Sequence, residues 1–581
     1  MYTPQIEDLK HTLKDIVGLE ALLEAGVFGD LSFDVVEAIL EEGGKFARDV
    51  IAPLNRVGDE HGCVFDTQSH DVTTAPGWKE AYQQWTEGGW AALPCDEEFG
   101  GQGLPLLVGL AAQELWNTAA SAFGIGTLLT QGAINALKSH GSDEIKQAYL
   151  AKMVSGQWTG TMCLTESQAG SDLGALKAKA VPNEDGSYSI SGTKIFITYG
   201  EHDLTENIIH LVLARLADAP AGSRGISLFV VPKFLLNEDG SPGKRNDVKC
   251  VGLEHKLGIH GSPTATMQFG DDGGAIGWLV GQENRGLNCM FTMMNDARLH
   301  VGMQGVAVAE RALQQALAFA KERKQSARPG SDGPVAIIEH PDVARMLLEM
   351  KAKTAAARAI CYECARALDL AEHRDAEHTG DEAQAALGAL LTPVNKAFGT
   401  DIGSEVASLG VQVHGGMGYI EETGAAQHLR DARITQIYEG TNGIQALDLV
   451  GRKLPLGNGQ VVKDWLASQR AIADGLSDDM AGLKAPLTTA IDAMERATTT
   501  MLSWLVAKDE RALAAATSYL RAFALVAGAA AMAKGAAASG DEERKQLVRY
   551  FTSNHLVQVA GLVKIVENGA GDILETASIL G

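Results

Sequence analysis

One acidic residue stands where a general base would be useful. The stretch RITQIYEGTNGIQ (433–445) places Glu439 between an apolar-aromatic run and a Gly-Thr-Asn-Gly turn. Most loop acids are simply solvated, although loops also carry many catalytic groups. A carboxyl in an apolar pocket has a raised pKa and can take a proton near neutral pH. Ile437, Tyr438 and Ile444 are the apolar neighbours that would enclose Glu439, so both interpretations stand at this point.

A second stretch combines hydroxyl groups with small residues. MCLTESQAGSDLGALKAKA (162–180) carries Thr165 and Ser171 around Ala169 and Gly170. Small residues let a ligand approach the backbone closely, and hydroxyls can donate to an acceptor on that ligand. The alternative is a Ser/Asp-rich turn ahead of a strand.

Two further patterns suit a planar, phosphate-bearing ligand. KIFIT (194–198) puts Phe196 and Thr198 on one face of a strand, which would give an aromatic wall beside a hydroxyl or an ordinary core strand. Gln412 and the turn at Gly415 and Gly416 present backbone amides that can hold phosphate or ribityl oxygens.

Other common signatures are missing from the sequence. It contains no GxxxxGK[ST], HExxH or GxSxG, and the glycines at 416 and 418 lack the third glycine of a dinucleotide fingerprint. Cys361 and Cys364 share one face of the helical pattern ARAICYECARALDL, without a second CxxC or His pair. We therefore expect core thiols and no metal site.

The pattern of apolar and polar residues changes three times along the sequence. Helical spacing up to about residue 158 gives way to β-branched and aromatic runs between Gly, Pro, Asn and Asp, such as IIHLVLARL and GISLFVVPKFLL. Helical patterns return near residue 281, and GRKLPLGNGQ (451–460) separates them from an Ala-rich helical end. We predict four domains, at 1–158, 159–275, 276–455 and 456–581, in a mainly α protein with a central β domain.

Composition narrows the class of protein. Of 581 residues, 45% are hydrophobic and 21% charged, and the net charge of -24 disfavours binding to nucleic acid. The first residues lack a signal-peptide pattern. The run AFALVAGAAAMA (522–533) is shorter than the roughly 20 residues that a membrane span needs, so it predicts a buried helix. We expect a soluble, cytoplasmic protein with no membrane partner.

Several motifs together resemble the acyl-CoA dehydrogenase family. They are L-T-E-x-x-A-G-S-D at 164–172, K-x-[WF]-I-T at 194–198, E-R at 322–323, Q-x-x-G-G-x-G at 412–418, R-D-A-R at 430–433 and I-Y-E-G-T at 437–441. The resemblance covers about residues 88–452. It implies a helical N-terminal domain, a middle β-barrel and a C-terminal four-helix bundle, here followed by a helical extension. Ser326 and Gly443 depart from residues that are common in the family.

The resemblance also implies the site. Glu439 would be the base that removes the α-proton of an acyl-CoA thioester, with FAD as cofactor and an electron-transfer flavoprotein as electron acceptor. FAD contacts are implied for Met162, Leu164, Thr165, Phe196, Thr198, Arg323, Gln412, Gly415, Gly416 and Thr441. Substrate contacts are implied for Ser171, Asn295, Arg298 and Gly440. Family members share their sites between subunits, and the extension favours a homodimer.

Within the family, four features resemble a long bacterial subgroup: residues 2–16, 337–350 and 438–454, and the helical extension. This finer resemblance implies oxidation of 3-(methylthio)propanoyl-CoA to 3-(methylthio)acryloyl-CoA, in dimethylsulfoniopropionate catabolism. A medium- or long-chain acyl-CoA dehydrogenase is the alternative. An acyl-CoA oxidase and a DNA-binding homologue are two lesser alternatives. The absence of a basic block after residue 461 disfavours the DNA-binding homologue. Glu254 is the second candidate for the base.

Replacement of Ser171 by alanine tests the implied substrate contact. The contact would be made equally in the ground state and in the transition state, so Ser171→Ala should raise KM more than it lowers kcat. Steady-state kinetics with a dye acceptor measure both constants. An unchanged KM for the best substrate would return Ser171 to the role of a turn residue.

Overall fold

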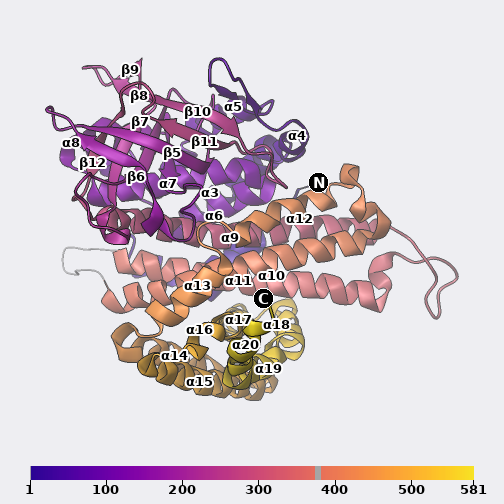
Figure 1. Ribbon diagram of the computed structural model, residues 1–581. Helices are drawn as coiled ribbons and strands as arrows, with labels where there is room; N and C mark the ends of the chain where they lie inside the picture. The colour runs from indigo at the N-terminus through magenta and orange to yellow at the C-terminus, as the bar shows by residue number, and fades with distance from the viewer. Residues whose placement is uncertain (1, 373–380, 581) are drawn as a thin grey trace. The chain divides into compact units, whose positions relative to one another are not determined.

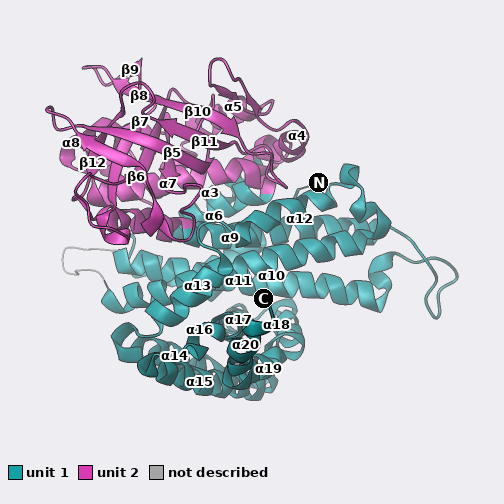
Figure 2. Ribbon diagram, in the orientation of Figure 1, with its two compact units in different colours: residues 1–45, 105–118, 298–581 teal, residues 46–104, 119–297 magenta. Residues whose placement is uncertain are grey.

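The structure is a computed structural model that describes residues 2–372 and 381–580 (Figure 1). These residues form two compact units (Figure 2). Unit 1 contains residues 1–45, 105–118 and 298–581, and unit 2 contains residues 46–104 and 119–297. Each unit is described by itself below.

Unit 2 is built on an eight-stranded sheet in which seven strands follow the order β10-β11-β5-β12-β7-β6-β3 and β4 pairs with β5. The strands are β3 (Trp158–Cys163), β4 (Lys179–Pro182), β5 (Tyr188–Thr198), β6 (Asn207–Ala214), β7 (Ser227–Pro232), β10 (Val248–Leu253), β11 (Thr264–Phe269) and β12 (Ala275–Val280). All neighbours are antiparallel except β3 and β6. Two small hairpins are β1 (Val64–Phe65) with β2 (Val72–Thr73) and β8 (Phe234–Leu236) with β9 (Pro242–Arg245).

The core of unit 2 follows from its strand sequences. Every residue of β6 and β7 is buried, as expected of continuous apolar runs covered on both faces. The helices of this unit are α4 (Leu54–His61), α5 (Trp78–Glu87), α7 (Ser121–His140) and α8 (Asp143–Val154). Helix α7 approaches β3 so closely that a Cβ on Gly160 would lie 2.5 Å from the Cβ of Ala133. The predicted strand-rich region is therefore confirmed as a β domain.

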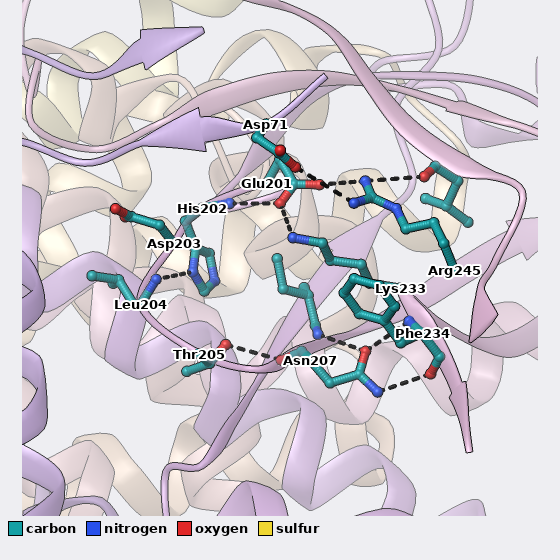
Figure 3. A network of polar contacts seen from close by, with 12 residues as sticks. Asp71, Glu201, His202, Asp203, Leu204, Thr205, Asn207, Lys233, Phe234 and Arg245 are labelled. Atoms are coloured by element: carbon teal, nitrogen blue, oxygen red, sulfur yellow. Dashed lines mark hydrogen bonds and ion pairs between the residues drawn. The ribbon is translucent and has the colours of Figure 1, made fainter. Parts of the chain in front are cut away.

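A buried polar network lies inside unit 2 (Figure 3). The carboxylate of Glu201, only 1% exposed, accepts hydrogen bonds from Lys233 Nζ and, at 3.0 Å, from Arg245 Nη2. Burial raises the pKa of Glu201, although both cations oppose this. Asp71 lies 3.5 Å from Arg245 at the outer end of the network.

Two histidines sit in the same core. Thr159 and Thr161 place their hydroxyls 2.9 Å from His202 Nε2 and 2.8 Å from His210 Nδ1. Burial, with a smaller contribution from Lys233, lowers the pKa of each ring to about 3. Both imidazoles are therefore neutral in the folded protein at any pH near neutrality.

Unit 1 is helical. It contains α9 (Gly286–Glu322) from residue 298 onward, and its next longest helices are α10 (Pro341–Glu372) and α11 (Glu382–His414), which lie side by side in Figure 1. The others before the extension are α1 (Ile6–His11), α2 (Leu19–Glu24), α3 (Phe33–Phe46), α6 (Leu106–Ala119), α12 (Ala425–Arg433) and α13 (Asn442–Asp448). The extension forms α14 (Gln460–Asp474), α15 (Lys484–Ala507), α16 (Arg511–Ala514), α17 (Ala516–Ser539), α18 (Glu542–Asn554), α19 (Val559–Lys564) and α20 (Ala570–Thr576).

Helix α17 is the centre of the extension. Its small side chains allow a close approach to α10, where a Cβ on Gly528 would lie 2.9 Å from the Cβ of Ala356. Phe523 stacks on Trp465 of α14, with ring centroids 3.7 Å apart. Within the described residues, α17 is the one helix with the length and composition of a membrane span, and 78% of its most apolar window is buried. The sequence prediction of a buried helix here is confirmed.

Helices α9 and α11 cross at glycines. A Cβ on Gly305 would lie 2.1 Å from the carbonyl oxygen of Gly399, and a Cβ on Gly302 would collide with Asn395. Only residues without a side chain allow this backbone approach. The crossing fixes the part of α11 that carries Lys396, which is fully buried.

Several local predictions agree with the structure. Cys361 and Cys364 are buried free thiols on α10, as expected, and helix α9 ends at Glu322, within the Glu-Arg motif at 322–323. The predicted linker at 451–460 is not extended, because a turn of π-helix and a kinked 3₁₀ segment (Leu456–Gly459) occupy most of it. The boundaries of the four predicted domains stay a prediction.

The buried histidines predict a loss of stability in acid. In the unfolded chain a histidine takes a proton below pH 6.5, whereas His202 stays neutral in the fold until about pH 3. Stability is therefore present above pH 6.5 and is lost as the pH falls. Between pH 7 and pH 5, each of the two buried histidines should lower the free energy of unfolding by about 2 kcal/mol. Urea denaturation of His202→Gln should show a smaller loss than wild type, whereas His61→Gln, at an exposed histidine of unit 2, should match wild type.

Candidate active site

Glu439 lies on a strained turn in unit 1, between a 3₁₀ segment (Ile434–Gln436) and helix α13. Its φ is +56°, and Gly440 follows with φ +85°. A left-handed residue other than glycine costs of order 1 kcal/mol and persists only where its surroundings impose it. Thr441 then caps α13, because its Oγ1 accepts a hydrogen bond from the N–H of Ile444 at 3.3 Å.

Two buried side chains hold this turn. Gln445 Nε2 donates to the carbonyl oxygens of Glu439 and Gly440 at 3.2 and 3.3 Å. Lys396 Nζ donates to the Gly440 carbonyl at 2.8 Å and to Asn442 Oδ1 at 3.0 Å. Gln445 and Lys396 are both 0% exposed. Side chains of helices α11 and α13 therefore fix the backbone conformation of Glu439 through these hydrogen bonds.

The carboxyl of Glu439 has the ionisation of a base. The residue keeps some accessible surface, yet the surroundings of its carboxyl are dense enough that burial raises its pKa to about 7. The positive charges of Arg298 and Lys396 act in the opposite direction. Arg298 is itself buried, with Nη1 3.6 Å from Asp448 Oδ2. A carboxylate poised near neutral pH in a cationic surrounding fits a general base better than a solvated loop acid.

Three residues were expected to form apolar walls around Glu439. Tyr438 donates its hydroxyl to Gln304, and Ile444 is half-buried. Ile437 is 47% exposed. Unit 1 thus brings together Glu439, Gly440, Thr441 and Arg298. Asn295 lies three residues before Arg298 on α9 and is exposed in unit 2.

In unit 2, the loop that begins at Leu164 is built around a buried ion pair. Lys194, 0% exposed, donates to the Leu164 carbonyl at 3.0 Å and to Glu166 Oε1 at 2.8 Å. Glu166 also accepts from the backbone N–H of Lys177 and Ala178, at 2.7 and 3.0 Å. Although burial opposes it, these donors hold the pKa of Glu166 below its usual value. The loop is a preformed element.

Phe196 stands out on β5. Its φ is +61°, at an irregularity in the pairing of β5 with β11, and the residue is 57% exposed. Lys194 and Ile197 are both buried, so the bulge shifts the alternation by one residue and leaves Phe196 and Thr198 on the less buried side. Thr165 lies beside them, because its carbonyl accepts from the N–H of Ile195 at 2.9 Å. Phe196 and Thr198 are therefore accessible in unit 2, and their role as an aromatic wall with a hydroxyl stays a prediction.

The remaining predicted residues are exposed or half-buried. Ser171 is exposed on the loop of unit 2, whereas Met162 on β3 is half-buried. In unit 1, Gln412, Gly415, Gly416 and Arg323 are exposed, and Gly415 ends α11 with φ +59°. Glu254, the second candidate base, follows β10 in unit 2, where the Thr266 hydroxyl lies 3.5 Å from its Oε1.

The sequence reasoning missed Lys396, Gln445, Glu166 and Lys194 as supports of the two loops. Glu166 and Lys194 lie inside two of the family motifs, in which roles were given instead to Leu164, Thr165, Ser171, Phe196 and Thr198. Lys396 had a signal of its own, since a lysine in the apolar run ALLTPVNKAFG must be buried with partners.

Comparison with known proteins shows which family this chain represents. It matches four sequence profiles: the acyl-CoA dehydrogenase N-terminal domain (35–157), middle domain (161–271) and C-terminal domain (284–454), and a domain described as acetyl-CoA dehydrogenase C-terminal like (461–577). The chain belongs to the acyl-CoA dehydrogenase family. Membership confirms the predicted fold class and the predicted class of flavin-dependent dehydrogenase.

Individual relatives match along the whole chain. The 3-methylmercaptopropionyl-CoA dehydrogenase of Ruegeria pomeroyi is 44% identical over 100% of both chains. A broad-specificity linear acyl-CoA dehydrogenase of Mycobacterium tuberculosis is 32% identical over 99% of this chain and 98% of its own. Among solved structures, an acyl-CoA dehydrogenase of Bacillus anthracis complexed with FAD shares the fold, with a TM-score of 0.75 and 23% identity over 94% of this chain and 90% of its own.

The buried pair of unit 2 predicts an unequal response to two lysine substitutions. Lys194→Met leaves the Glu166 carboxylate buried without its cation, which should cost about 3–5 kcal/mol of unfolding free energy. Lys249→Met breaks a more exposed pair with Asp271, 2.8 Å long, and should lower the unfolding free energy far less, because solvent screens this pair. Chemical denaturation measures both.

The double variant Lys194→Met/Glu166→Gln is the control. It removes both charges, so it should be more stable than Lys194→Met alone. Equal stabilities of Lys194→Met and Lys249→Met would mean that the pair does not hold the loop.

Proposed function

We propose that this protein oxidises an acyl-CoA thioester to the 2-enoyl-CoA, with Glu439 as the base that removes the α-proton. The observation that carries the proposal is the carboxyl of Glu439, whose pKa burial raises to about 7 while the turn around it is fixed. The α-carbon of a thioester is a weak acid. A positioned base with a pKa near the working pH is what its deprotonation requires.

The same turn supports a place for the thioester carbonyl. Among residues 2–372 and 381–580, the backbone N–H of Glu439 has no hydrogen-bond acceptor. An N–H that is fixed in space and uncommitted can donate to an oxygen on which negative charge develops. Glu439 would thus act twice, through its carboxylate on the α-proton and through its amide on the carbonyl oxygen.

The cofactor is FAD. The residues of unit 2 fit a flavin: Phe196 is an aromatic ring held outward on a left-handed backbone, with the hydroxyl of Thr198 on the same side and the preformed loop at Leu164 and Thr165 beside them. We assign the ring system to these residues with Met162, and the phosphates and adenosine to Arg323, Gln412, Gly415, Gly416 and Thr441. When bound, FAD accepts the hydride that leaves the β-carbon.

The substrate that we propose is 3-(methylthio)propanoyl-CoA, which would place the enzyme in dimethylsulfoniopropionate catabolism. Support comes from the full-length likeness to the Ruegeria pomeroyi enzyme, at 44% identity. Ser171, Asn295, Arg298 and Gly440 are the residues that we assign to substrate. A straight-chain acyl-CoA is the second candidate, favoured by the full-length likeness to the Mycobacterium tuberculosis enzyme. A panel of acyl-CoAs with a dye acceptor decides between them.

The partner and the cellular setting follow the same proposal. We infer that electrons pass to an electron-transfer flavoprotein and that the protein works as a cytoplasmic homodimer. Reoxidation of the reduced enzyme by that flavoprotein, compared with reoxidation by O₂, distinguishes a dehydrogenase from an oxidase. Light scattering of the purified holoenzyme gives its oligomeric state.

Glu439→Gln tests the base. Glutamine keeps the volume and polarity of glutamate but accepts no proton near neutral pH. The variant should fold, stay yellow and bind acyl-CoA, whereas the rate of flavin reduction should fall by at least about a hundredfold, the usual worth of a positioned base. Anaerobic bleaching of the flavin band under saturating substrate measures that rate.

Glu254→Gln is the matched control, since Glu254 is the second candidate for the base. It should change the rate by less than about a factor of two, as substitutions away from a site do. Normal bleaching in Glu439→Gln together with slow bleaching in Glu254→Gln would transfer the role. Colourless wild-type protein that fails to bind added FAD would end the proposal as a whole.

A further inference from the structure

Lys396 is a buried cation without a paired carboxylate. It is 0% exposed, in the middle of α11. Its ammonium donates to two neutral oxygens, the Gly440 carbonyl and Asn442 Oδ1. Within the described part of the chain, no carboxylate oxygen lies within 4.0 Å of its Nζ. A charge removed from water in this way is costly unless other charges stabilise it from further away.

The charges that face Lys396 come from three segments. Glu439, on the turn, and Asp401, on α11, favour its protonated form, and Arg298 on α9 opposes it. Asp401 also accepts a hydrogen bond from Asn442 Nδ2 at 2.7 Å, which ties it to the same turn. Arg298 faces Asp448 of α13 and, beyond it, Arg452.

We propose that Lys396 is a positioning residue for the base. Its ammonium fixes the turn through Gly440 and Asn442, and its charge sets the pH at which the Glu439 carboxylate becomes able to take a proton. The inference rests on the proposed role of Glu439 and goes beyond it, because it names a group that both positions that residue and, with Arg298, tunes its titration.

The geometry supports both parts. Gly440 is the residue next to Glu439, so the 2.8 Å bond from Lys396 fixes the peptide group that sets the direction of the Glu439 side chain. The left-handed φ of +56° at Glu439 needs such a constraint. The charge acts on the same residue: burial raises the pKa of Glu439, and Arg298 and, to a smaller extent, Lys396 limit that rise to about 7.

The influence is mutual. Burial lowers the pKa of Lys396 to about 7, and the charge of Glu439 is the largest factor that opposes this. Two groups that favour each other's charged form titrate as a unit. Loss of the Lys396 charge must therefore raise the pKa of Glu439, because the folded site then stabilises the carboxylate less.

The test is the pH dependence of flavin reduction in Lys396→Met, which has similar length and no charge. The quantity is the rate constant of anaerobic bleaching divided by the substrate Kd, measured with 3-(methylthio)propanoyl-CoA from pH 6 to 9, which reports the ligand-free enzyme. The midpoint should move upward by about one unit, in line with the loss of a nearby opposite charge. Below the wild-type midpoint the rate should fall about tenfold, and it should recover toward wild type at high pH.

Thr400→Val is the matched control. The Thr400 hydroxyl also contacts Asn442 Oδ1, at 3.2 Å, but it is neutral. This variant should lower the melting temperature slightly and leave the midpoint in place. A rate that falls equally at every pH in Lys396→Met, with an unmoved midpoint, would overturn the inference and leave Lys396 a merely structural residue.

Two further variants keep the test decisive. If Lys396→Met does not fold with flavin bound, Lys396→Arg keeps the charge and should keep the wild-type midpoint, and a shift of one unit would contradict the inference. Glu439→Gln is measured in parallel. If it reduces flavin normally, the assignment of the base fails, whereas a slow Glu439→Gln with an unshifted Lys396→Met refutes the inference about Lys396 alone.

Discussion

The removal of the Glu439 carboxyl from water is the constraint on which the helical unit depends. Burial makes the carboxylate basic, yet complete burial without compensation would keep it protonated and useless as a base. Cations on two different helices, Arg298 on α9 and Lys396 on α11, oppose this effect and stabilise the carboxylate. Those helices reach the required proximity only because glycines 302, 305 and 399 let their backbones meet.

In both units a buried lysine holds the loop that carries proposed ligand contacts. In each, a fully buried lysine donates to a backbone carbonyl of the loop that carries proposed ligand contacts, Lys194 to Leu164 and Lys396 to Gly440. They differ in the counter-charge. Lys194 has Glu166 at 2.8 Å, so its pair is internally neutral and structural, whereas Lys396 shares its charge with Glu439 from a distance. The difference separates a lysine that only holds a loop from one that also tunes a titrating group.

Much of the fold could be predicted from local pattern. The apolar runs of β6 and β7 and the buried alanine-rich α17 are short-range features that periodicity and composition record. The role of Glu439 was indicated by the resemblance to the family, because the local pattern alone left a solvated loop acid equally open. The helical structure of the segment at 451–460 was not predicted, since Pro and Gly occur in kinked helical turns as well as in linkers.

The supporting contacts of the site could not be predicted in the same way. Lys396 and Gly440 are 44 positions apart, and their hydrogen bond depends on how α11 packs. The left-handed backbone of Phe196 and of Glu439 is likewise imposed by tertiary contacts, because neither residue type favours it. Sequence indicated which residues have the right chemistry, and long-range packing decided which of them stand together.

The close contact between α17 and α10 limits how this protein can be engineered. Gly-to-Ala replacement is a common way to strengthen a helix, by up to about 1 kcal/mol at an exposed position. At Gly528 the added methyl would lie 2.9 Å from the Ala356 side chain, so the gain in helix propensity would be opposed by steric overlap. Gly561, on α19, has no atom within 4 Å of an added Cβ. A designer who seeks heat resistance in the extension should therefore begin at its periphery and leave its centre as it is.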